Sequence, residues 1–141
     1  MSLRNYQRPQ ISLLSDRLLG EPRRFIQVIY GPRQVGKTTL VSQFLRQSGV
    51  PHHYASADAV AAADSLWIAH QWEQARLTAA RHPGGDAILA LDEIQKVENW
   101  SEQVKKEWDR DTREKRNVKV ILLGSLRLLL QQGLTESPAG R

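Results

Sequence analysis

The stretch that decides the fold is "FIQVIYGPRQVGKTTLVSQFL", residues 25–45. Branched and aromatic residues fill 24–30 up to a glycine, a pattern that predicts a buried strand. Apolar side chains then recur on one face from Gly36 to Ser48, with Gly49 as the stop, which predicts a helix. The chain therefore bends between a strand and a helix, and the residues of the bend indicate what it does.

The bend fits the pattern G-x-x-x-x-G-K-[ST] at every fixed position, in the strand–turn–helix context that the pattern requires. Such a loop wraps its amide N–H groups around a polyphosphate, and its glycines let the backbone approach without a Cβ in the way. Lys37 can reach the β- and γ-phosphates, and the Thr38 hydroxyl is suited to bind Mg²⁺. The predicted nucleotide-binding residues are Gly31, Pro32, Arg33, Gln34, Val35, Gly36, Lys37, Thr38 and Thr39.

Two other roles stay open for this segment. Thr39 follows the last fixed position of the pattern, and packing or capping of the helix is its alternative role. For the whole segment, the alternative is a chance glycine-rich turn with an exposed lysine. The strand and helix on either side disfavour that alternative.

Two acidic residues end the apolar run "AILALDE", 87–93. A Mg²⁺ held by one hydroxyl and the nucleotide needs a nearby carboxylate, so Asp92 is the predicted metal-binding partner of Thr38. Glu93 lies one residue further on, where it can orient and deprotonate an attacking water. This adjacency favours hydrolysis over phosphoryl transfer to a bound small molecule. Taken alone, such a pair is typical of a strand that ends at solvent. The upstream phosphate loop is what favours the functional interpretation.

A further strand is predicted over 118–125, stopped by Gly124. In sheets of this kind it lies between the phosphate-loop strand and the strand that ends at Asp92. The Ser125 hydroxyl is then predicted to reach the γ-phosphate or the water. The alternative for Ser125 is an ordinary turn residue after a glycine.

Four further segments complete the pattern. They are a short amphipathic helix at 10–19, a strand at 51–56, a helix at 65–82 and a helix that Asn99 can cap. The charged run "RDTREKR", 110–116, is interpreted as a solvated helix end. Strands that alternate with helices imply right-handed crossovers, a parallel sheet and a three-layer α/β/α sandwich.

Composition limits the class of protein. A chain of 141 residues suits one domain, and no apolar run approaches the about 20 residues that span a bilayer. The absence of cysteine and of a secretory signal core fits a reducing cytoplasm. A formal charge of +5 suits nucleotide phosphates or nucleic acid as partners. The 4 histidines lack metal-like spacing with carboxylates, and the 4 tryptophans are predicted to lie in the core or an interface.

Three stretches together resemble one protein family. They are "GPRQVGKTTLV", "LDEIQKVENWSEQVKKEWD" and "VILLGSLRLLLQQGLTESPAGR", which are spread over the chain from Gly31 to Arg141. They are similar to signature stretches of prokaryotic AAA-type ATPases whose core is followed by a C-terminal domain of poorly known role. The resemblance implies a parallel sheet in the order 5-1-4-3-2, ATP and Mg²⁺ as ligands, and dimers or rings in which an arginine completes a neighbour's site. Arg141 matches the arginine of the family pattern, and Arg127 is the other basic candidate.

By the same resemblance, the chain is expected to be an N-terminal fragment of a longer protein. Residues 1–23 are expected to form an amphipathic helix and a linker, and residues 24–141 an ATPase core that is incomplete at its C-terminus. The chain ends before the fifth strand, so a sheet of about four strands in the order 1-4-3-2 is expected. The first strand is then an edge that is open to pairing with another chain.

The leading functional prediction is hydrolysis of ATP to ADP and phosphate with Mg²⁺, which drives or gates an interaction made by the missing C-terminal domain. The predicted catalytic residues are Lys37, Glu93, Ser125 and Arg141. An alternative is a nucleotide-binding interaction module with negligible turnover. The expected fragment lacks the lid and the neighbour's arginine, and an arginine finger contributes about 10³ to 10⁵ in rate. A small-molecule kinase is disfavoured by the lack of an arginine-rich lid segment and of an acceptor site. Expected partners are ATP or ADP, further copies of the chain, and DNA or a protein, with no membrane.

Overall fold

The fold is a parallel sheet between two layers of helices. This computed structural model describes residue 23 and residues 26–30 and 36–124. Its strands are β1 (Gln27–Tyr30), β2 (His52–Ser56), β3 (Asp86–Asp92) and β4 (Asn117–Gly124). Its helices are α2 (Lys37–Ser48), α3 (Trp67–Arg81) and α4 (Trp100–Glu114), with the short 3₁₀ helix η2 (Ile94–Lys96) after β3.

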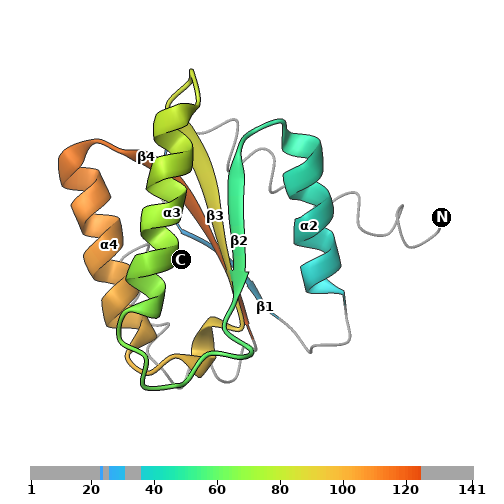
Figure 1. The fold of residues 1–141 in the computed structure, drawn as a ribbon. Coiled ribbons are helices and arrows are strands. Elements are labelled where there is room, and N and C mark those ends of the chain that lie inside the picture. The colour runs from blue at the N-terminus through green and yellow to red at the C-terminus, as the bar shows by residue number, and fades with distance from the viewer. Residues whose placement is uncertain (1–22, 24–25, 31–35, 125–141) are drawn as a thin grey trace.

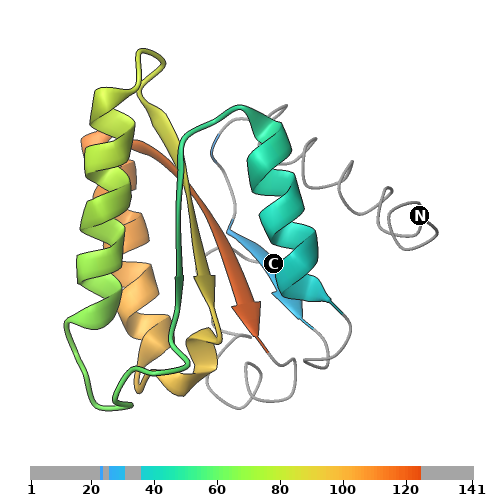
Figure 2. The ribbon, with the colours of Figure 1, turned by 45° about the vertical axis from the view of Figure 1, so that its right-hand side comes forward.

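All pairs of neighbouring strands are parallel, and the spatial order is β1-β4-β3-β2. Helices α3 and α4 cover one face of the sheet, and α2 covers the other (Figure 1, Figure 2). The predicted α/β sandwich with strand order 1-4-3-2 is therefore confirmed. Within the described residues, β1 and β2 are the two edges of the sheet.

Alternate residues of the central strands pack into two separate cores. On β3, Leu89 and Leu91 lie in the core beneath α3 and α4, whereas Ile88 and Ala90 lie in the core beneath α2. Burial on both faces explains why β3 is a continuous apolar run rather than an alternating one. The tryptophans of the first core, which were predicted to be core or interface residues, are Trp72, Trp100 and Trp108.

The predicted helices that fall within the described residues are found with small shifts at their ends, and one predicted cap is wrong. Helix α3 begins at Trp67 rather than at Ser65. Asn99 directly precedes α4, as expected, but its side chain makes no capping hydrogen bond. A capping side chain works from an extended backbone, whereas Asn99 has a left-handed φ of 58°. The predicted cap therefore lacks the backbone geometry that it needs.

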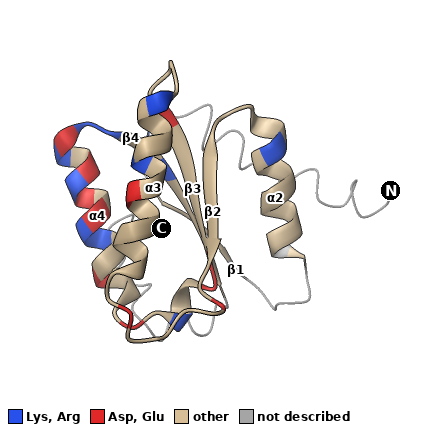
Figure 3. Cartoon of the chain, viewed as in Figure 1, with Lys and Arg blue, Asp and Glu red and all other residues tan. Residues whose placement is uncertain are grey.

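The charged end of α4 is solvated only in part. Figure 3 shows acidic and basic residues along much of α4, and most of 110–116 is exposed. Asp111, in contrast, is 0% exposed and accepts hydrogen bonds from Trp72 Nε1 and Arg76 Nε, both at 2.8 Å. The prediction of a solvated helix end is wrong at Asp111, because a buried arginine compensates the charge of this carboxylate.

Arg23 fastens the segment before β1 to α4 and β4. Its guanidinium carbon lies 3.5 Å from the centre of the Trp108 ring. Its Nε donates to the Val118 carbonyl at 2.8 Å, and its Nη1 donates to Thr112 Oγ1 at 2.8 Å. One side chain thus combines a cation–π contact with hydrogen bonds to two elements.

Replacing Arg23 with alanine should lower the free energy of unfolding by about 1–2 kcal/mol, because the stacked and hydrogen-bonded guanidinium is lost. Urea denaturation followed by tryptophan fluorescence measures the change. Lys105→Ala, at an exposed position of α4, is the matched control and should leave the midpoint unchanged. Equal midpoints for the two variants would contradict the anchoring role of Arg23.

The predicted helix at 10–19 lies outside the described residues. No helix among the described residues is both long enough and apolar enough to cross a membrane.

Candidate functional site

The carboxyl ends of the four strands meet at one edge of the sheet. The register pairs Tyr30 with Gly124, Leu91 with Leu122 and Ser56 with Asp92. Helix α2 begins at the same edge (Figure 2). In open α/β sheets, ligands bind in the crevice at the carboxyl ends of the strands. This edge therefore carries the candidate site.

The start of α2 is the described part of the predicted phosphate-loop pattern. Gly36, the residue before the helix, has a left-handed φ of 76°, which glycine adopts without a steric penalty. Lys37 is the first residue of α2, and Thr38 and Thr39 follow in its first turn. Thr39 is exposed. The N–H groups of a first helical turn have no partner within the helix, so this end of α2 suits an anion.

The other loop residues named from the sequence lie outside the described residues. They are Gly31, Pro32, Arg33, Gln34 and Val35. The same holds for Ser125, for Arg127 and for Arg141. The predicted roles of all eight stay predictions.

Thr38 and Asp92 come together although 54 residues separate them in the chain. Thr38 Oγ1 donates a hydrogen bond to Asp92 Oδ2 at 2.7 Å. Asp92 is the last residue of β3 and is 4% exposed. The two residues that the sequence assigns to one Mg²⁺ therefore lie side by side at the start of α2.

Glu93 lies just beyond the end of β3 in a strained backbone conformation. Its φ is 55°, a left-handed value that is uncommon for a residue other than glycine and that clusters at functional sites. Its backbone N–H donates to Asp92 Oδ1 at 2.8 Å. Its side chain is buried, and Glu93 Oε1 accepts a hydrogen bond from Gln95 Nε2 at 2.8 Å. The fold thus holds the predicted catalytic carboxylate in one place.

Two residues of this cluster were not found from the sequence. Tyr54 on β2 donates from its hydroxyl to Asp92 Oδ2 at 2.5 Å. Burial, together with the hydrogen bond to Asp92, raises the pKa of Tyr54 well above its usual range, so the phenol stays protonated as a donor. Gln95 on η2 is the second. A usable signal was parallel pairing of 51–56 with the strand ending at Asp92, which puts Tyr54 and Asp92 on one face.

The donor set fits Mg²⁺ in a nucleotide complex. Mg²⁺ prefers oxygen ligands and is usually bound by one or two carboxylates together with substrate phosphates. The Thr38 hydroxyl and the Asp92 carboxylate supply such oxygens. No group of three or more histidine and acidic side chains that could hold a metal occurs in the described part of the chain. One hydroxyl and one carboxylate suit a site that nucleotide phosphates complete.

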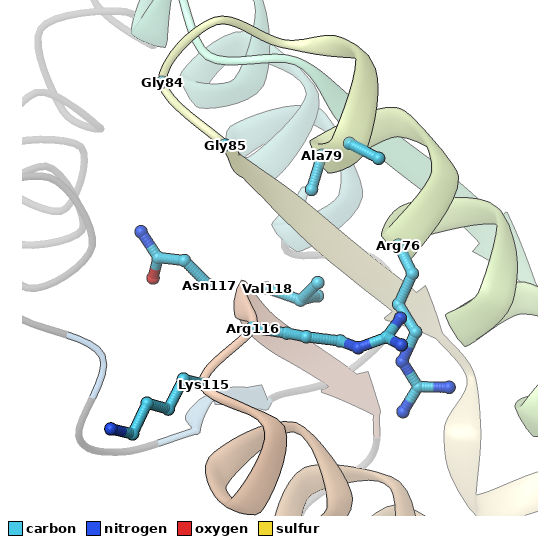
Figure 4. A pocket seen from close by; sticks show the side chains of 9 residues that line it. Arg76, Ala79, Gly84, Gly85, Lys115, Arg116, Asn117 and Val118 are labelled. Atoms are coloured by element: carbon cyan, nitrogen blue, oxygen red, sulfur yellow. The ribbon is translucent and has the colours of Figure 1, made fainter.

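A pocket of about 580 Å³ lies at the opposite edge of the sheet, beside the amino ends of β3 and β4. Figure 4 shows Arg76 and Arg116 extending toward the same side of this pocket. Both guanidinium groups already have acidic partners, since Arg76 Nε lies 2.8 Å from Asp111 and Arg116 Nε lies 2.9 Å from Glu114. The pocket is thus basic in composition but its arginines are paired, and it is remote from Thr38 and Asp92.

The fold, a parallel sheet in the order β1-β4-β3-β2, is consistent with the class of the P-loop nucleoside-triphosphatases. Within that class the chain belongs to the AAA family, because the model of the AAA domain matches residues 23–141. Membership supports a nucleotide-binding, ATPase-like module. A search of curated proteins finds no relative that matches the chain.

Proposed function

We propose that the chain binds ATP with Mg²⁺ and hydrolyses it to ADP and phosphate. The observation that carries the proposal is the contact between Thr38 Oγ1 and Asp92 Oδ2 at 2.7 Å, next to a helix start preceded by a left-handed glycine. A hydroxyl and a carboxylate at a helix N-terminus are the protein groups that a Mg²⁺–nucleotide complex needs. Family membership supports the same class of ligand.

Each residue has a distinct role in this proposal. The loop that ends at Gly36 and the first turn of α2 hold the phosphates, and Lys37 supplies a positive charge to the β- and γ-phosphates. Thr38 and Asp92 hold Mg²⁺, which offsets the negative charge of the phosphates. Glu93 takes a proton from water, the water oxygen bonds to the γ-phosphorus, and the bond to the bridging oxygen breaks with its electron pair leaving on ADP.

A nucleotide-binding module with little turnover is the second candidate, and the surroundings of Glu93 favour it. Glu93 is 6% exposed, and one of its oxygens accepts a hydrogen bond from Gln95. A general base must reach the proton that it removes. If Glu93 stays in this position when ATP binds, the site holds the nucleotide without cleaving it.

The wider setting is proposed on the resemblance rather than on described residues. We propose a core over 24–141 that follows an N-terminal helix and linker over 1–23. In this proposal nucleotide turnover drives or gates an interaction with DNA or a protein, and the chain associates with further copies of itself. Arg141 completes a neighbour's site. The cysteine-free composition supports a cytoplasmic setting.

The test of nucleotide binding is calorimetric titration of the chain with ATP in the presence and absence of Mg²⁺. We expect Lys37→Ala to weaken ATP binding by about 10- to 100-fold, because a charge-assisted contact of about 1.5–3 kcal/mol is lost. Phosphate release is assayed on the same samples to separate binding from turnover.

Lys106→Ala, at an exposed position on α4, is the matched control and should bind ATP as the parent does. Equal affinities for the parent and Lys37→Ala would contradict phosphate binding at the start of α2. Binding without phosphate release would favour the second candidate.

A further inference from the structure

Tyr54 extends the candidate site to the edge strand β2. It pairs with Ala90 in the parallel register, two residues before the pair of Ser56 and Asp92. Residues two apart on a strand share a face, so Tyr54 lies on the same face of the sheet as Asp92. Its half-buried ring packs against the core beneath α2. The hydroxyl at the end of the ring thereby reaches the carboxyl edge.

Both oxygens of Asp92 are held by hydrogen-bond donors. Tyr54 Oη and Thr38 Oγ1 donate to the same oxygen, Oδ2, at 2.5 Å and 2.7 Å. The backbone N–H of Glu93 donates to Oδ1 at 2.8 Å. The donors come from β2, from α2 and from the residue after β3, so rotation of the carboxylate breaks contacts to more than one element.

The ring and the hydroxyl of Tyr54 have separate roles. The ring fills space next to the core beneath α2, and a phenylalanine would fill the same space. The hydroxyl donates the hydrogen bond to Asp92. Partners that hydrogen-bond a metal ligand orient it, and their loss typically lowers metal affinity by about 10- to 100-fold.

We propose that Tyr54 is a positioning residue, whose hydroxyl fixes the Asp92 carboxylate in the orientation that binds Mg²⁺ together with Thr38. The inference rests on the proposed function, because it assigns Asp92 and Thr38 to a Mg²⁺–nucleotide complex. Thr38 directs its hydroxyl proton to Asp92, so the lone pairs of Thr38 are left for the metal. Tyr54 donates to the same oxygen, Asp92 Oδ2, and so holds this oxygen where Thr38 can also donate to it.

The test compares Tyr54→Phe with the parent in calorimetric titrations with ADP, each with and without Mg²⁺. ADP affinity is measured over a range of Mg²⁺ concentrations. We expect the Mg²⁺ concentration at which half of the Mg²⁺-dependent change in ADP affinity is reached to rise by about tenfold in Tyr54→Phe. ADP affinity without Mg²⁺ should be unchanged, because the phosphate loop is untouched. The readout is binding of ADP and Mg²⁺, so it does not depend on turnover.

His52→Ala, at an exposed position of the same strand, is the matched control and should keep the parent's response to Mg²⁺. An unchanged or stronger response to Mg²⁺ in Tyr54→Phe would overturn the positioning role, since the hydroxyl would then be neutral or would compete with the metal. A parent that fails to bind ADP under any condition overturns the proposed function itself. These two failures are therefore distinguishable.

Discussion

Replacing Glu93 with glutamine should lower ATP turnover by about 10²- to 10⁴-fold and leave ATP binding intact. Glutamine has nearly the shape of glutamate, and its side-chain oxygen can still accept the hydrogen bond from Gln95 that Glu93 Oε1 accepts. Glutamine cannot take a proton from water at neutral pH. The change therefore removes the general base and keeps the buried packing around it.

Single-turnover phosphate release and calorimetric ATP titration, run on the same preparation, measure the two effects. Glu98→Gln is the matched control, because it is the same chemical change at an exposed position five residues further on. Turnover at the parent rate in Glu93→Gln would assign activation of the water to another group. Loss of ATP binding in Glu93→Gln would instead assign Glu93 to the nucleotide-binding part of the site.

Much of the fold could be predicted because its signals are local. Strand β3 follows turn residues and is apolar between its terminal residues Asp86 and Asp92, since both of its faces are buried. Helix α2 opens after a glycine that needs a left-handed backbone and closes at Gly49, which has φ 74°. Such features depend on neighbours in sequence. The strand order came from the family resemblance, because periodicity alone does not say which strands pair.

The candidate site could be predicted only where a motif names the residue. Thr38 and Asp92 belong to two recognisable patterns, and their contact links them across the fold. Tyr54 and Gln95 belong to no pattern of this kind. Their roles depend on the pairing of β2 with β3 and on the turn of η2. The sequence shows a tyrosine in a weak strand, and only the register brings its hydroxyl to Asp92.

The buried ion pairs between α3 and α4 could be predicted from the sequence even less than the contacts of Tyr54 and Gln95. Asp111 stands in a run of charged residues, where a surface position is the ordinary expectation. Its partners Trp72 and Arg76 lie 39 and 35 residues earlier in the chain. Burial alone would lower the pKa of Arg76, but the carboxylates of Asp111 and Glu107 outweigh it and raise this pKa. Arg76 therefore stays charged inside the protein.

Replacing Asp111 with alanine should lower the free energy of unfolding by about 3–5 kcal/mol, because it leaves the buried charge of Arg76 without its closest partner. The Arg76 and Asp111 side chains are 2% and 0% exposed, and Arg76 Nε lies 2.8 Å from Asp111 Oδ1. Glu107 Oε1, at 2.9 Å from Arg76 Nη2, still offsets part of the charge. Trp72 Nε1 also loses its acceptor, which adds to the loss.

Urea denaturation followed by far-UV circular dichroism measures this loss, and two variants sharpen it. Asp111→Asn keeps an oxygen that can accept from Trp72 or Arg76 but removes the negative charge. Its free energy of unfolding should therefore fall between those of the parent and Asp111→Ala. Glu114→Ala removes an exposed carboxylate from the same helix and should leave the midpoint in place. If Asp111→Ala were no less stable than Glu114→Ala, the contact between Arg76 and Asp111 would contribute no more than a solvent-exposed pair. The apolar contacts of α3 and α4, together with the ion pair of Arg76 and Glu107, would then join the two helices.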